Sequence, residues 1–132
     1  MKVIIFTDGG SRGNPGPSAL GVYITDGAGK VLKEHKRYLG TQTNNHAEYQ
    51  AIIDGLVEAK KLGATEVAMK MDSELAVKQL NRVYRVKNPG IAVQYLEVSR
   101  LVAGFSKVTF THVRREYNKE ADRLVNEALD AQ

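Results

Sequence analysis

The chain has 132 residues, 42% of them hydrophobic and 26% charged, which suits one compact domain over residues 1–132 with a single core. It has no cysteine, so disulfide bonds and thiolate metal sites are excluded, and no apolar run approaches the length of a membrane span. The 19 basic and 15 acidic residues give a net charge of +4, which suits a polyanionic partner without identifying one.

The first part of the chain predicts three strands. Val3–Phe6 is a short apolar run that reads as a buried strand. Leu20–Thr25 and Val31–Leu39 predict two more, joined by the hairpin turn signal at Asp26–Gly29. A glycine- and proline-rich stretch, TDGGSRGNPGPSALG, separates the first strand from the second.

The rest of the chain predicts alternating helices and strands. The apolar period becomes helical from Asn44 to Leu62, and Gly63 is a natural stop. The later predicted elements are a strand at Val67–Met71, a short helix from Ser73 to Leu80, a helix at Ile91–Val102, a strand at Lys107–Val113 and a helix at Asn118–Ala131. Hairpin strands followed by β-α-β crossovers predict an α/β fold, a mixed sheet covered by helices.

Two acidic residues stand where predicted strands end. Asp8 closely follows the first strand, and Asp72 follows the fourth. Functional sites in open α/β sheets gather at strand ends, so these carboxylates would lie side by side if the two strands are neighbours. Each also has an ordinary structural interpretation, since Asp8 can begin a turn and Asp72 can cap the next helix.

Two further acids lie on the apolar faces of predicted helices. Glu48 shares a helix face with Ile52 and Leu56, and Asp122 shares one with Val125 and Leu129. Acids near helix N-termini are often structural, because they interact favourably with the helix dipole. Four such acids together fit that interpretation poorly. Clustered carboxylates repel one another unless cations intervene, and oxygen ligands without cysteine favour magnesium or manganese.

Four segments resemble the signature segments of type 1 ribonuclease H. They are TDGGSRGNPG, TNNHAEYQA, MDSELAVKQL and NKEADRLVNEA, in matching order and spacing from Val3 to Ala128. The resemblance implies a ribonuclease H-like fold, a five-stranded mixed sheet with its first three strands antiparallel and helices on both faces. It also implies an endonuclease that cleaves the RNA strand of RNA–DNA hybrids, leaving 3′-hydroxyl and 5′-phosphate ends.

The resemblance carries the acidic quartet of the family to Asp8, Glu48, Asp72 and Asp122. These residues would be both catalytic and metal-binding, with two Mg²⁺ ions per site and Mn²⁺ as a substitute. Asp8 would bridge the ions, Glu48 and Asp72 would hold the ion on the leaving-group side, and Asp122 would hold the ion on the nucleophile side.

Other matched positions imply contacts with the substrate. The residues are Gly9, Gly10, Asn14, Thr43, Asn44, Asn45 and Ser73. The glycines would let a nucleic-acid backbone approach closely, and the asparagines would contact 2′-hydroxyls or bases in the minor groove. The alternative for Asn14 is an ordinary surface turn, and for Asn44 and Asn45 it is helix capping.

The chain departs from the family pattern in two places. The basic helical protrusion of many members is reduced to NRVYRVKNPG, in which Arg82, Arg85 and Lys87 could form a smaller phosphate-binding patch, so we expect a member without this handle. The loop before the last acid, RREYNKEAD, lacks the histidine found in many members. Arg115 or Glu116 could replace that histidine, as a cation near phosphate or as a proton acceptor.

Three alternatives stay open at this stage. The first is another nuclease on the same fold, such as a junction resolvase or an integrase-like enzyme. The second is a non-catalytic nucleic-acid-binding domain, although such domains usually lose at least one acid. The third, a phosphate-binding ATPase fragment, lacks a GxxxxGK[ST] motif. We expect a cytoplasmic monomer that binds RNA–DNA hybrid, with no membrane association and no implied protein partner.

Overall fold

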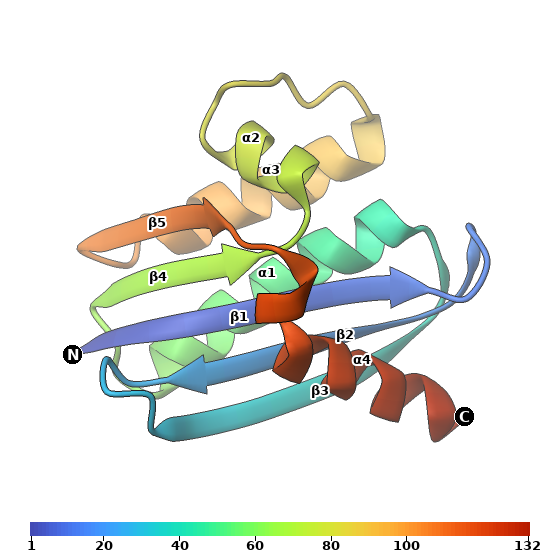
Figure 1. Cartoon of the computed structure of the whole chain (residues 1–132). Coiled ribbons are helices and arrows are strands. Elements are labelled where there is room, and N and C mark those ends of the chain that lie inside the picture. Colours follow the sequence, from blue (N-terminus) through green and yellow to red (C-terminus); the bar gives the residue numbers. More distant parts are fainter.

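The computed structural model describes residues 1–132. The chain contains one five-stranded sheet with the strand order β3-β2-β1-β4-β5 (Figure 1). The strands are β1 (Lys2–Ser11), β2 (Gly16–Thr25), β3 (Val31–Gln42), β4 (Glu66–Met71) and β5 (Lys107–His112). The first three pair antiparallel, whereas β4 runs parallel to both β1 and β5. The predicted mixed sheet is therefore confirmed.

Helices cover both faces of this sheet. They are α1 (Asn44–Lys61), α2 (Glu74–Leu80), α3 (Pro89–Val102) and α4 (Lys119–Asp130), and a short 3₁₀ helix at Arg115–Tyr117 precedes α4. In Figure 1, α4 crosses one face, while α1 and α3 lie behind the sheet on the other. The core divides in the same way. The main cluster joins β1, β2 and β4 to α1, and a smaller one joins Ala19 to α4.

No helix is both apolar enough and long enough to cross a membrane.

Local sequence accounts for the limits of α1. Thr43 caps its start, because the Thr43 hydroxyl accepts a hydrogen bond from the backbone N–H of His46 at 3.2 Å. Ile52, Leu56 and Ala59 follow at helical spacing, and all three are buried. Beyond the end of the helix, Gly63 adopts a positive φ of 83°, a conformation that glycine reaches at little cost.

The register of β1 and β4 sets two of the acids next to each other. The last pair of their parallel ladder is Thr7 with Met71, so Asp8 and Asp72 are the next residues on two adjacent strands. The first strand is longer than predicted, because β1 continues through Gly9 and Gly10 to Ser11 while paired with β2. Glycine weakens a strand on its own, but here a neighbouring strand supplies the hydrogen-bonding partners.

Two glycines let helices approach the sheet from opposite sides. A Cβ atom on Gly9 would lie only 2.2 Å from the backbone carbonyl of Ala47 in α1. A Cβ atom on Gly21 would lie 2.3 Å from the carbonyl oxygen of Ala121 in α4. Ala47 precedes Glu48 and Ala121 precedes Asp122, so these two close contacts bring the helix-borne acids down to the sheet.

Replacing Gly9 by alanine should therefore damage the fold, because the new methyl group must displace the backbone of α1. We expect Gly9→Ala to lower the free energy of unfolding by about 1–3 kcal/mol or more. Gly10→Ala is the matched control, since its Cβ would meet nothing closer than Val125 Cγ1 at 3.8 Å. Urea unfolding of both variants checks this, and equal stabilities would contradict the close contact.

Candidate active site

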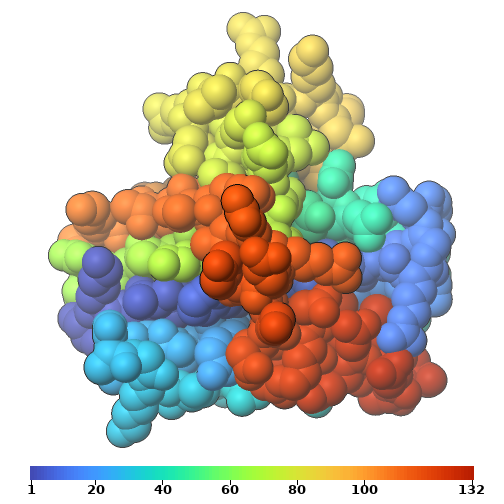
Figure 2. Space-filling model, in the orientation of Figure 1, coloured from blue at the N-terminus to red at the C-terminus, as the bar shows by residue number.

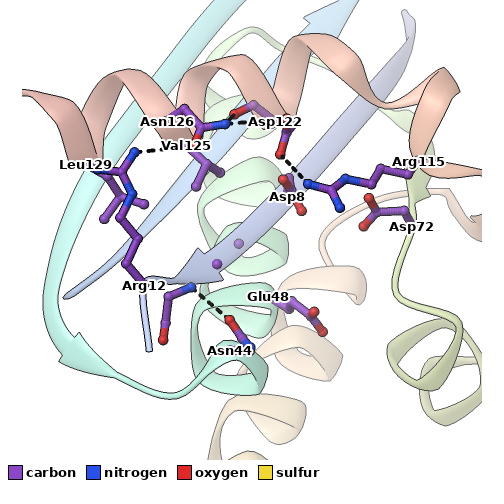
Figure 3. A pocket seen from close by; sticks show the side chains of 13 residues that line it. Asp8, Arg12, Asn44, Glu48, Asp72, Arg115, Asp122, Val125, Asn126 and Leu129 are labelled. Carbon is purple, nitrogen blue, oxygen red and sulfur yellow. Dashed lines mark hydrogen bonds and ion pairs between the residues drawn. The ribbon is translucent and has the colours of Figure 1, made fainter. Parts of the chain in front are cut away.

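One open pocket of about 450 Å³ brings the four predicted acids together (Figure 3). Asp8 comes from β1, Glu48 from α1, Asp72 from the end of β4 and Asp122 from α4. These residues are far apart in the chain, and only the strand order and the two helix contacts unite them. The wall is almost entirely polar, with only two hydrophobic residues, Val125 and Leu129.

Asp8 has a strongly raised pKa, because it is half-buried among the other three acids of the pocket. Burial and the negative charges of Asp72, Asp122 and Glu48 raise the pKa of Asp8 from 3.8 to about 8. The Asp122 side chain contributes further to this increase in the pKa of Asp8. Neighbouring carboxyl groups repel one another when both are ionised, so this site holds a proton more readily than an isolated carboxyl group.

Burial also raises the pKa of the other two acids on this side of the pocket. For Glu48, a hydrogen bond from the Ser73 hydroxyl opposes part of that increase. For Asp72, hydrogen bonds and the nearby charge of Arg115 oppose it. As the side chains stand, no three acidic or histidine residues are grouped closely enough to hold a metal ion. Repulsion among the carboxylates favours such spacing.

Asn118 is a site residue that the sequence analysis did not identify. Its side chain is 1% exposed and donates a hydrogen bond to the Thr7 carbonyl oxygen at 2.9 Å. The same side chain bonds the Asp72 carboxylate, and its backbone carbonyl accepts from the Asp122 N–H at 3.1 Å. Asn118 therefore connects Thr7, which precedes Asp8, with Asp72 and Asp122. Only an alignment could have indicated it, because an asparagine before a helix is usually a cap.

Of the predicted polar substrate contacts, Asn44 lines the pocket, whereas Asn14, Thr43 and Asn45 lie outside its wall. The Asn44 side chain accepts a hydrogen bond from the Ser11 N–H at 2.8 Å, and the Asn44 N–H donates to the Asn14 side chain at 3.1 Å. These bonds fasten the turn after β1 to the start of α1. Thr43, rather than Asn44 or Asn45, provides the helix cap, and Asn45 is exposed.

The remaining predicted residues separate into two groups. Gly9 and Gly10 line the pocket, and Ser73 caps α2 through the Ala76 N–H at 3.2 Å while contacting Glu48. Arg115 reaches into the pocket, with its guanidinium 3.9 Å from an Asp122 oxygen (Figure 3). Glu116 does not line this pocket. It pairs with Arg114 at 3.7 Å and lines a separate hollow with Phe6.

Comparison with known proteins identifies the family. A family model described as "Reverse transcriptase-like" matches residues 6–128. The crystal structure of RNase H1 from Halobacterium salinarum aligns with a TM-score of 0.98 and 38% identity, over the whole of both chains. The chain belongs to the type 1 ribonuclease H family.

Two further type 1 ribonuclease H relatives are informative. LC11-RNase H1, solved in complex with an RNA/DNA hybrid, is 43% identical with a TM-score of 0.94, and the match covers 98% of this chain and 97% of that one. A Mycobacterium tuberculosis protein named "Bifunctional protein" is 46% identical over 99% of this chain. The chain spans only 36% of that protein's length. As expected of a member without the handle, only residues 81–88 connect α2 to α3.

The raised pKa of Asp8 makes the fold pH-dependent. Between pH 4 and 8 the folded protein binds a proton that the unfolded chain releases, so stability falls as the pH rises through this range. Asp8→Asn removes the ionisation, so this variant should be more stable than the wild type at pH 8 by about 1 kcal/mol or more. The difference should disappear near pH 4.

Thermal unfolding in EDTA across this pH range measures the effect. Asp130→Asn is the control, because Asp130 is exposed and its pair with Arg12 lies at the surface, where ion pairs contribute little. A difference between Asp8→Asn and wild type that stays constant with pH would show that Asp8 ionises normally in the folded protein.

Asn118→Ala should weaken both the fold and the arrangement of the acids. The Thr7 carbonyl loses a buried donor, which costs about 1–3 kcal/mol of unfolding free energy. The Asp72 pKa should also rise, because the hydrogen bond that lowers it is lost. Carboxyl NMR titration reports the second effect separately from stability, and an unchanged Asp72 titration would remove Asn118 from the site.

Proposed function

We propose that this protein is an endonuclease that hydrolyses the RNA strand of RNA–DNA hybrids with two divalent cations, giving 3′-hydroxyl and 5′-phosphate ends. The observation that carries the proposal is the convergence of Asp8, Glu48, Asp72 and Asp122 in one open polar pocket. Family membership supports nuclease chemistry at this pocket. The solved complex of LC11-RNase H1 with an RNA/DNA hybrid supports the choice of substrate.

The chemistry of the pocket fits a divalent metal. Its acids offer carboxylate oxygens, the hard ligands that Mg²⁺ and Mn²⁺ prefer, and no cysteine or methionine lines the pocket. The pKa of Asp8 is raised first by burial and then by the negative charges of Asp72, Asp122 and Glu48, and a bound cation would offset both effects. Bound at Asp8, Glu48, Asp72 and Asp122, two such ions would supply activation of water and stabilisation of the leaving oxygen.

The side chains around the acids would position the substrate. Asn14 and Asn44 brace the turn beside the pocket, and exposed Asn45 lies next to them on α1. Amide groups can both donate to and accept from 2′-hydroxyls, which an A-form-like hybrid displays in a wide, shallow minor groove. Recognition of these hydroxyls would select the RNA strand. Thr43 at the helix start would contact a DNA-strand phosphate, and Arg115 would place a cation beside the reacting phosphate.

A substrate panel tests the proposal. Labelled RNA–DNA hybrid, duplex RNA and duplex DNA are incubated with the protein in Mg²⁺, Mn²⁺ or EDTA. We expect cleavage of the RNA strand in the hybrid, which stops in EDTA and returns with excess Mg²⁺, and products with 5′-phosphate ends. Cleavage of duplex DNA instead would favour a resolvase-like enzyme, and activity in EDTA would refute the metal mechanism.

Matched variants connect the reaction to the pocket. Asp8→Asn and Asp72→Asn should reduce the cleavage rate by about a thousandfold or more while hybrid binding persists, because each substitution removes a charge with little change of shape. Arg115→Gln should lower activity, whereas Glu116→Gln should not, since Glu116 lies outside the pocket. Retained activity in Asp8→Asn would refute the assigned site.

A further inference from the structure

A second cavity, of about 610 Å³, lies between α3 and the loop that leads into it. Its apolar wall is formed by Val83, Tyr84, Val86, Ala92, Tyr95 and Leu96. We call this cavity the α2–α3 groove. Figure 2 shows this part of the chain projecting from the top of the molecule in yellow. The groove shares no lining residue with the acidic pocket.

Exposed large hydrophobic residues gather at the groove. Val83 and Leu96 are 67% and 68% exposed, and Tyr84 and Val93 nearby are also exposed. These are four of the nine large hydrophobic residues that the chain exposes. Single exposed apolar side chains are common, but a gathered set around a cavity is typical of a surface that a partner covers.

The charged side chains at the groove are all positive. Arg82 and Arg85 line it, no aspartate or glutamate does, and neither arginine forms a salt bridge. Arg82 has a φ of 63°, where the chain leaves α2 and where glycine is the usual residue. An arginine therefore occupies a position whose backbone favours glycine, and its charge has no partner within the chain.

Apolar and cationic groups together favour a protein ligand over a nucleic acid. Phosphate groups bind to cations and hydrogen-bond donors, and the side chains of Val83 and Leu96 are neither. Tyr84 could stack on a base, yet the Lys78 ammonium lies 5.0 Å from its ring centroid and 3.3 Å from its hydroxyl. A second copy of this chain is also a poor occupant, because each copy carries a net charge of +4.

We propose that the α2–α3 groove docks an acidic segment of another protein, one that carries an aromatic or long aliphatic side chain. The apolar side chain enters between Val83 and Leu96, and its burial supplies most of the affinity. Carboxylates of the segment pair with Arg82 and Arg85, whose planar guanidinium groups bind carboxylates through two hydrogen bonds. This partner surface is separate from the proposed nuclease site and does not depend on it.

Fluorescence anisotropy with defined peptides tests the proposal. The probe is a short labelled peptide of alternating aspartate and phenylalanine, and the control peptides replace phenylalanine by serine or aspartate by asparagine. We expect the probe to bind with a Kd in the micromolar range and each control to bind at least about tenfold more weakly. Competition with single-stranded DNA tests whether the site prefers nucleic acid.

Variants place the binding in the groove. Leu96→Ser should weaken probe binding about tenfold while leaving hybrid cleavage unchanged, because Leu96 is exposed and does not line the acidic pocket. Arg82→Gly should weaken it by a similar factor without loss of thermal stability, because glycine suits the positive φ at this position.

Three results would overturn the proposal. The first is equal binding of the serine control, which would mean that charge alone attracts the probe. The second is probe binding that Leu96→Ser does not weaken. The third is that single-stranded DNA displaces the probe and also binds the wild type and Leu96→Ser with equal affinity. That result would make the groove a nucleic-acid surface. All three can be observed whether or not the protein cleaves hybrids.

Discussion

Repulsion among half-buried carboxylates is the interaction that the rest of this structure must oppose. Asp8 lies among three other acids in a pocket that partly excludes water, and its pKa rises because the ionised form is unfavourable there. A fold that minimised its free energy alone would separate these groups. The rest of the protein holds them together, and divalent cations would relieve the same repulsion, as the proposed phosphodiester chemistry requires.

Rigid contacts on both faces of the sheet oppose that repulsion. Gly9 and Gly21 allow α1 and α4 to touch the strands through their backbones, at the residues that precede Glu48 and Asp122. Buried Asn118 adds hydrogen bonds to Thr7 and Asp72 from the start of α4. The acids therefore depend on main-chain positions rather than on flexible side-chain contacts, which is how a preorganised site maintains its geometry.

The acidic pocket and the α2–α3 groove have linings of different chemistry. The acidic pocket is open and polar, and it lies where parallel strands end, as expected for a site on an open α/β sheet. The α2–α3 groove is apolar with arginines at its edge, and it lies at the short connection between α2 and α3. The two surfaces therefore suit ligands of different chemistry.

Local patterns in the sequence were enough to predict most of the elements, because strand alternation and helical period are encoded by neighbouring residues. Those patterns also drew attention to the four acids, and the family resemblance then grouped them into one predicted site. The sequence did not reveal several features that the structure shows. They are the length of β1, the cap at Thr43, the packing role of Gly9, the hydrogen bonds of Asn118 and the different positions of Arg115 and Glu116. Each depends on which distant segments meet. The sequence by itself therefore determined which acids to propose for the chemistry, and only the tertiary structure determined how they are held, because strand order and helix packing join residues that share no local signal.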